Sequence, residues 1–482
     1  MTYRSLVLFF AACFVSSTGC AAAAVPRAEG GSPPIAAPPN IVFILADDLG
    51  LRDLSCTGSD YHQTPNLDRL AAQGMLFTDA YANCANCAPT RAALMSGMYA
   101  PRTGVYTVNS SERGPAAQRV LVPTPNTTTL APEIVTLAES LREAGYTTCH
   151  VGKWHLGAGN TGPLAQGFDL NIAGNHRGHP PSYHSPYNNP ALDDGPEGEY
   201  LTDRLTDEAI AFMRDNAHGP FFLYLPYYTV HTPLQPREDL LAEAQSREPG
   251  ELHSHPRYAA MVGALDENVG RLLHALEQLG LDDNTLVVFT SDNGGMSPQT
   301  DMAPLRGSKG MVYEGGVRVP LIVCWPGVVD PSSRCDEPVI TLDFYPTLVD
   351  AARGTMPDSQ PADGESLLPL FRDARATLGR EALYWHFPAY LHGYRGMQEE
   401  SHRASWRATP CSVVRAGDWK LIRDYETNTD TLYHLDRDLG ETQDLAQRHP
   451  DKRDELAALL DAWLEELDAP IPTEPNPDYR GD

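Results

Sequence analysis

Several short apolar runs in this chain end in polar residues, and this pattern limits the possible folds more than any other feature. The first run, NIVFILADD at 40–48, ends in two aspartates. Similar runs occur at 146–157, 221–233, 284–295 and 319–325. Segments with helical periodicity occur between them, at 64–74, 130–145 and 261–279. This alternation predicts an α/β fold whose large, mostly parallel sheet is covered by helices on both faces.

Two of these runs are followed by pairs of oxygen-bearing side chains. Asp47 and Asp48 follow the first run, and Asp292 and Asn293 follow the run at 284–295. Ligands of such sheets bind beyond the carboxyl ends of the strands, so neighbouring strands would bring the four side chains together. Oxygen ligands select a hard cation, either calcium or magnesium. Each pair alone could instead be a turn or a helix cap, but their recurrence favours a metal site.

The pattern of predicted secondary structure changes after about residue 370. Residues 412–424 and 431–436 resemble short antiparallel strands, and 453–467 has the pattern of a helix. We therefore expect a catalytic domain at 38–370 and a smaller C-terminal subdomain at 371–482, which contains an antiparallel sheet and one helix.

The first 20 residues have the pattern of a secretory signal peptide. Arg4 precedes an apolar stretch at 6–15 that is too short to span a bilayer. The sequence then reads Ser-Thr-Gly-Cys, so Cys20 is either lipidated, as in a bacterial lipoprotein, or part of an ordinary signal cleaved within 21–24. Residues 21–37 resemble a flexible tether. These features predict an exported protein, periplasmic or anchored to the outer membrane in a bacterium and secreted otherwise.

The net charge of −27 makes nucleic acid an improbable partner, so clustered basic residues carry more information than usual. Only four of the 36 basic residues are lysines. Lys153 lies in GKWHLG, where an extended chain would place it on the same face as His155, and Lys309 lies in RGSKG. Unlike arginine, lysine can act as a general acid.

Seven cysteines follow Cys20, and this odd number suggests that one has a special role. Their spacing does not indicate a zinc site, although Cys324 and Cys335 could form a disulfide. Cys87 begins Cys-Ala-Pro-Thr-Arg, which matches the Cys-x-Pro-x-Arg core recognised by enzymes that oxidise cysteine to formylglycine.

CAPTRAALMSG (87–97) and six other segments resemble the type I, arylsulfatase A-like sulfatases of the alkaline phosphatase superfamily. These segments, in the same order as in the family, are NIVFILADDLG, GKWHLG, TSDNGG, LRGSKGMVYEGGVRVPLIV, DGESLLPL and GDWKLI with LYHLDRDLGE. The resemblance covers about 38–470 and implies an alkaline-phosphatase-like sandwich with a smaller C-terminal domain, which has a four-stranded antiparallel sheet and a helix. Thr90 and Ser308 replace the more common Ser and Gly.

The resemblance also implies a set of site residues. Cys87 would be converted to formylglycine by a formylglycine-generating or anaerobic sulfatase-maturating enzyme, and its hydrated aldehyde would attack sulfur. One calcium ion would be held by Asp47, Asp48, Asp292, Asn293 and the diol made from Cys87. Arg91 and Lys153 would orient the diol, and His155 would assist sulfate release. His231 and Lys309 would bind the sulfate and protonate the leaving oxygen.

The expected substrate is a sulfated carbohydrate, and a small aryl sulfate should also react. Two segments rich in His, Tyr and Trp, 173–190 and 383–396, could stack on sugar rings, with Lys153, His231 and Lys309 at the sulfate. They supply Tyr183, His184 and His386 as candidate sugar-binding residues. The same aromatic residues could equally be packing residues of loops.

Two other functions remain open at this point. Phosphodiesterases and phosphonate monoester hydrolases of the same superfamily also use formylglycine, although two lysines with two histidines favour sulfate. An anchored glycan-binding protein without catalytic activity is the other alternative, and the complete set of catalytic positions argues against it.

Overall fold

The computed structural model describes residues 1–2, 37–393, 403 and 405–481. The predicted signal peptide beyond Thr2, Cys20 and almost all of the predicted tether lie outside the described residues. From Ile35 onward the chain forms one compact unit. Among the described residues, no helix has both the length and the apolar composition that a membrane crossing requires.

An eight-stranded sheet forms the centre of this unit, in the order β5-β4-β6-β1-β7-β8-β2-β9. The strands β5, β4, β6, β1 and β7 run parallel, whereas β8 is antiparallel to both β7 and β2. The predicted mixed, mostly parallel sheet is therefore confirmed. Its strands are β1 (Asn40–Ala46), β2 (Met75–Phe77), β4 (Thr147–Val151), β5 (Leu170–Ile172), β6 (Phe221–Pro226), β7 (Thr285–Ser291), β8 (Leu321–Cys324) and β9 (Ser333–Cys335).

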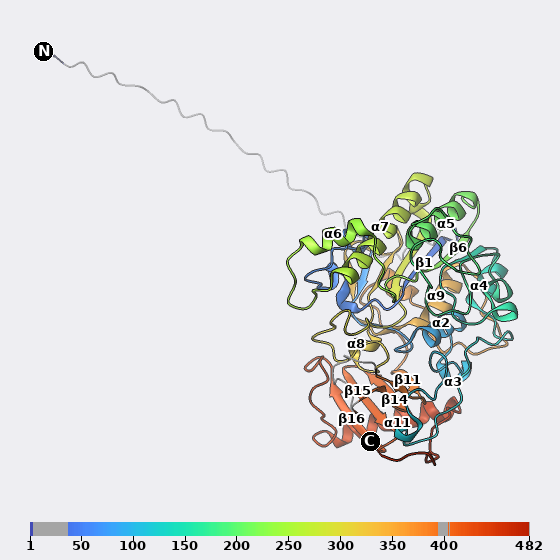
Figure 1. Ribbon diagram of the computed structural model, residues 1–482, viewed down its shortest axis with the longest axis vertical. Helices are drawn as coiled ribbons and strands as arrows, with labels where there is room; N and C mark the ends of the chain where they lie inside the picture. Colours follow the sequence, from blue (N-terminus) through green and yellow to red (C-terminus); the bar gives the residue numbers. More distant parts are fainter. Residues whose placement is uncertain (3–36, 394–402, 404, 482) are drawn as a thin grey trace, which may run out of the picture. The chain divides into compact units, whose positions relative to one another are not determined.

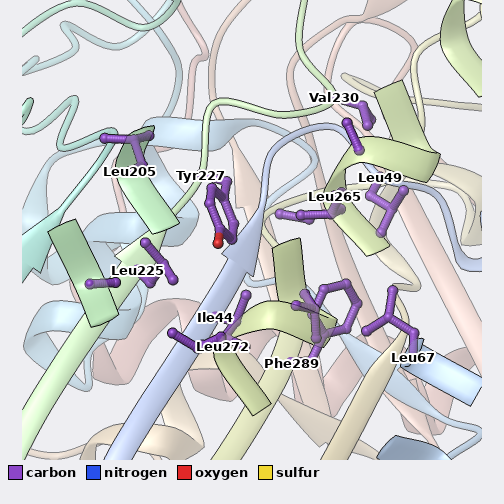
Figure 2. Packing of buried hydrophobic residues seen from close by; sticks show 14 of the residues in the cluster. Ile44, Leu49, Leu67, Leu205, Leu225, Tyr227, Val230, Leu265, Leu272 and Phe289 are labelled. Carbon is purple, nitrogen blue, oxygen red and sulfur yellow. The ribbon is translucent and has the colours of Figure 1, made fainter. Parts of the chain in front are cut away.

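Helices cover both faces of this sheet (Figure 1). Side chains of β1 alternate between two cores, so that Ile44 lies in one core and Phe43 in the other. Figure 2 shows Ile44 and Phe289 of the sheet packed near Leu272 of a covering helix. The first face is covered by α1 (Pro65–Gln73), α5 (Leu201–Asp215), α6 (Glu238–Ser246) and α7 (Pro256–Leu279). The second is covered by α2 (Cys87–Ser96), α4 (Leu137–Glu143), α9 (Phe344–Ala351) and α10 (Leu368–Arg372).

The helix expected at 130–145 is shorter than its apolar pattern indicates. It begins at Leu137 because Thr136 and Glu139 form a capping box. The Thr136 side chain accepts a hydrogen bond from Glu139 N at 3.2 Å, and Glu139 accepts one from Thr136 N at 2.7 Å. The apolar residues before it belong to a loop that packs against the core.

The C-terminal region contains the predicted four-stranded antiparallel sheet and helix (Figure 1). The sheet order is β11-β14-β15-β16, and a third core joins it to α11. These elements are β11 (Leu383–Phe387), β14 (Cys411–Ala416), β15 (Trp419–Asp424), β16 (Thr429–His434) and α11 (Pro450–Glu466). Smaller elements are α3 (Ala100–Thr103), α8 (Glu314–Val317), β3 (Ala80–Tyr81), β10 (Val339–Ile340), β12 (Leu391–His392) and β13 (Trp406–Ala408).

Candidate active site

The two acidic pairs meet at the carboxyl edge of the central sheet. Strands β1 and β7 are parallel neighbours in which Ala46 lies beside Ser291, so the residues that follow them are also adjacent. Asp48 N donates a hydrogen bond to Asp292 Oδ1 at 3.2 Å, and Asn293 Nδ2 donates one to Asp48 Oδ1 at 2.9 Å. The expectation that the four side chains come together is confirmed.

Each of the three aspartates at this edge pairs with a different cation, and all of these side chains are buried. Lys153 Nζ lies 2.7 Å from Asp47 Oδ2, Lys309 Nζ lies 2.7 Å from Asp48 Oδ2, and Arg91 Nη2 lies 2.7 Å from Asp292 Oδ2. Arg91 Nη2 also lies 3.9 Å from Asp47 Oδ1, so the three aspartates and three cations form one buried ionic cluster.

Burial raises the pKa of Asp47 to about 8, although Lys153 opposes the shift. Burial has the same tendency at Asp48, but there Lys309 and His231 outweigh it and hold the pKa well below its usual value. The pKa values of the neighbouring Asp47 and Asp48 are therefore shifted in opposite directions. An additional positive charge beside Asp47 would lower its pKa and favour its ionised form.

Cys87 is the first residue of α2, directly beneath the cavity at this edge. Its Sγ lies 3.9 Å from Asp48 Oδ1. The hydroxyl of Thr90 holds the preceding turn, because it accepts a hydrogen bond from Cys84 N at 3.1 Å and donates one to Cys84 O at 2.9 Å. Burial raises the pKa of the Cys87 thiol to about 12, so the unmodified side chain is neutral at physiological pH.

Two histidines approach Cys87 from loops that follow strands. His231 Nδ1 lies 2.7 Å from Thr232 O and must donate its proton there, so Nε2 is the nitrogen 3.6 Å from Asp48 Oδ2. Burial and then Lys309 lower the pKa of His231 to about 3. His155 has a φ of 62°, and its buried Nδ1 has no hydrogen-bond partner among the described residues.

These groups border a cavity of about 510 Å³. Four of the predicted catalytic residues line it, namely Cys87, His155, His231 and Lys309. Arg91 and Lys153 lie behind this wall, where they pair with the aspartates. Arg91 Nη1 also donates to Lys153 O at 2.9 Å, which links the two.

The donors at the strand ends fit a hard metal ion. Asn293 Oδ1 is buried and has no hydrogen-bond partner among the described residues. An oxygen of Asp47 and one of Asp48, Cys87 Sγ and an imidazole nitrogen of His231 all lie within 4.8 Å of one another. An unsatisfied amide oxygen beside clustered carboxylates is the type of site that calcium or magnesium occupies.

The three predicted sugar-binding residues do not line this cavity. Tyr183 is fully buried, and its hydroxyl donates to Tyr228 O at 2.6 Å and is 2.8 Å from His231 O, so it supports the loop of His231 from behind. His386 is buried in the C-terminal region, 2.7 Å from Ser412 Oγ. His184 packs against Tyr200 at the edge of its loop. The assignments of Tyr183 and His386 to sugar binding are therefore wrong, because neither side chain is accessible.

The sequence analysis missed several residues of the cavity wall. Residues 176–179 were inside a predicted sugar-binding segment but were not singled out. The others lie outside the quoted motifs, so those motifs do not identify them. The lining residues that were missed are Asn86, Val108, Asn109, Arg113, His176, Arg177, Gly178, His179, Met296 and Arg407.

Comparisons with known families agree with this geometry. The family model described as Sulfatase matches residues 39–355. A second model, described as N-sulphoglucosamine sulphohydrolase, C-terminal, matches residues 308–469. Together the two models include every strand of both main sheets.

Individual relatives give the same result. A sulfatase of Formosa agariphila is 36% identical over an alignment that covers 90% of this chain and 90% of that protein. Human N-acetylgalactosamine-6-sulfatase is 30% identical over 91% of this chain and 87% of its own length. The crystal structure of Ps i-CgsB in complex with k-i-k-neocarrahexaose has a TM-score of 0.74 and 30% identity, and covers 90% of this chain and 94% of that one. This chain therefore belongs to the type I sulfatase family of the alkaline phosphatase superfamily, and is a hydrolase of that family.

Proposed function

We propose that this protein is an exported enzyme that hydrolyses sulfate esters of carbohydrates, using a formylglycine made from Cys87 and a bound calcium ion. The observation that supports this most is the position of Cys87, which begins a Cys-x-Pro-x-Arg segment at the start of α2, beside the oxygen-rich strand ends and the cavity. The names of the relatives favour a carbohydrate substrate, since one acts on N-acetylgalactosamine 6-sulfate groups and one structure contains a neocarrahexaose.

The environment of Cys87 argues against a direct role for its thiol. With a pKa of about 12 the thiol stays protonated, and a protonated thiol is a weak nucleophile. A hydrated aldehyde at this position would supply two hydroxyls, one to attack sulfur and one whose deprotonation expels sulfate. Arg91 and Lys153, which are held by Asp292 and Asp47, support the wall behind it.

The leaving oxygen of a sugar needs a proton, and Lys309 is the better placed donor. Although burial opposes its charge, Asp48 raises the pKa of Lys309, so this side chain is an ammonium at neutral pH. His231 is neutral, and its Nδ1–H is already used at Thr232 O. His231 Nε2 is thus available to accept a hydrogen bond, and Lys309 to donate a proton.

Calcium would be held by Asp47, Asp48, Asp292 and Asn293, and would polarise the nucleophilic oxygen. Removal of the ion with a chelator should lower the melting temperature of the protein, because the folded state then loses the stabilisation that ion binding gives it. Differential scanning fluorimetry measures the shift, and calcium should restore it while sodium should not. An identical melting temperature with and without chelator contradicts the metal site.

Peptide mass spectrometry across residues 78–91 tests the nucleophile. Protein coexpressed with a formylglycine-generating enzyme should show a loss of about 18 Da at Cys87. The converted protein should hydrolyse 4-nitrophenyl sulfate faster than a 4-nitrophenyl phosphonate monoester. The proposal would be contradicted if Cys87 remained a thiol in protein coexpressed with this enzyme. It would also be contradicted if the converted protein hydrolysed the phosphonate monoester faster than the sulfate.

A further inference from the structure

The cavity above Cys87 is rich in positive charge, although the net charge of the chain is −27. Lys309, Arg113 and Arg177 are among the residues that line it, and none of the lining residues that the structure describes is Asp or Glu. In a strongly acidic protein, such a local excess of cations creates a positive potential that favours an anionic ligand.

The cations of the reaction centre do not account for this excess. Arg91, Lys153 and Lys309 all form ion pairs with the aspartates at the strand ends, and of these three only Lys309 lines the cavity. The reaction centre already has cations for the sulfate that is cleaved. Arg113 and Arg177 of the cavity wall are additional to this set.

Arg113 lies in the loop between α3 and α4 and is half-buried. It forms no hydrogen bond or ion pair with any residue that the structure describes. Partial burial lowers its pKa, and none of the carboxylates that the structure describes opposes this shift. A guanidinium that has lost part of its hydration without gaining a counterion gains most from a bound anion.

Arg177 lies on the segment that follows β5 and is fixed by a neutral partner. Its Nη1 donates a hydrogen bond to Asn188 O at 2.9 Å, and its backbone N donates to Asn175 Oδ1 at 2.8 Å. These bonds orient the guanidinium without neutralising it, because none of the described residues forms an ion pair with it. Arg177 therefore has the geometry of a preorganised anion-binding group.

We infer that the cavity binds a second anionic group of the substrate, a sulfate ester or a carboxylate on the same sugar chain, through Arg113 and Arg177. This inference rests on the proposed function, which places the sulfate to be cleaved at Cys87. The substrate class is then a carbohydrate chain with at least two negative charges close together. A sugar with one sulfate would leave Arg113 and Arg177 without an anionic partner among the residues that the structure describes.

Isothermal titration calorimetry can test this on the full chain with unconverted Cys87, because no turnover then occurs. The probes are N-acetylgalactosamine 6-sulfate, N-acetylgalactosamine 4,6-disulfate, and N-acetylgalactosamine 6-sulfate linked to glucuronate. The wild-type protein should bind at least one of the two dianionic probes about tenfold more tightly than the monosulfated sugar. The preferred probe identifies the second group as a sulfate or as a carboxylate.

In Arg113→Gln and Arg177→Gln this preference should fall to about twofold or less, and in wild type it should weaken with added salt. Arg214→Gln is the matched control, because Arg214 is exposed and pairs with Asp215 on α5, and it should keep the full preference. Equal affinities of the wild type for all three probes, or a uniform loss in the two variants, would overturn the inference. Turnover of 4-nitrophenyl sulfate by matured protein is measured separately, so an inactive enzyme that keeps the binding preference contradicts only the proposed function.

Discussion

Lys309 pairs with Asp48, and on the proposed function the same side chain donates a proton to the leaving oxygen. It approaches Asp48 to 2.7 Å and also faces the cavity. An arginine there would keep the positive charge, but its guanidinium is wider, and because its charge is delocalised it is a weaker acid than an ammonium in the same surroundings.

We expect Lys309→Arg to lower kcat for N-acetylgalactosamine 6-sulfate about a hundredfold, because the sugar oxygen leaves poorly without a proton. The loss for 4-nitrophenyl sulfate should be clearly smaller, since nitrophenolate is a good leaving group. Steady-state kinetics with the two substrates measure the difference. Equal losses would point to a structural effect, and a near wild-type rate on the sugar would exclude the proton-donor role.

At this scale the sequence predicted the strand-end residues better than the loop residues. Asp48 and Asp292 could be placed because they follow apolar runs whose direction in the sheet fixes where they lie. Tyr183 and His386 could not be placed in this way. The same local sequence is compatible with an aromatic side chain that packs inward and with one that faces a ligand. Only the tertiary contacts show that both are buried.

At the scale of elements, the junction after β4 positions Lys153. Gly152 has a φ of 127°, and a Cβ at this position would lie 2.0 Å from Pro226 O. The close approach allows Lys153 N to donate to Pro226 O at 2.7 Å, which fixes β4 against β6. The expected extended chain through His155 is thus interrupted, since β4 ends at Val151.

Gly152→Ala should therefore reduce the free energy of unfolding by about 2–4 kcal/mol, from left-handed strain and overpacking together. It should also lower kcat more than about tenfold, because Lys153 shifts. Urea unfolding and assays with 4-nitrophenyl sulfate measure the two effects.

Gly145→Ala is the matched control for this variant. Gly145 has a φ of 92°, but nothing lies within 4 Å of its added Cβ. It should lose only about 1 kcal/mol and keep its activity. Identical behaviour of the two variants would show that the contact with Pro226 is unimportant.

At the scale of the whole molecule, a buried ionic cluster joins the C-terminal sheet to the catalytic region. Lys420 of β15 lies 3.0 Å from Glu314 of α8 and 2.8 Å from Glu441. Glu314 N also donates to Glu441 Oε2 at 2.7 Å. Because α8 closely follows Lys309 in the chain, the cluster fixes one end of the loop that carries this residue.

Burial, despite the opposing Lys420, raises the pKa of Glu441 from 4.5 to about 7. The folded state then binds more protons than the unfolded state between these values, so this contribution is complete below pH 4.5 and is lost as the pH rises to 7. As the pH rises from 4.5 to 7.5, the wild type should lose roughly 1–3 kcal/mol of its free energy of unfolding through this group. Glu441→Gln has no such group and should not show this loss. Urea unfolding across this range checks the prediction.

Glu455→Gln serves as the control, because Glu455 is exposed and pairs with Lys452, and its profile should parallel that of the wild type. If the profile of Glu441→Gln is also parallel, Glu441 does not titrate in this range.

The sequence could predict the C-terminal sheet from its strand patterns. It could not predict this cluster, because Glu314 is 106 residues from Lys420 and 127 residues from Glu441 in the sequence.

The burial of α2 has a consequence for the order of events during biosynthesis. All ten residues from Cys87 to Ser96 are buried, including Pro89 and Arg91 of the recognition core. A second enzyme could not bind this stretch in the finished protein without unfolding part of it. On the proposed chemistry, the oxidation of Cys87 must therefore precede the completion of folding, and a molecule that folds too early would remain permanently inactive.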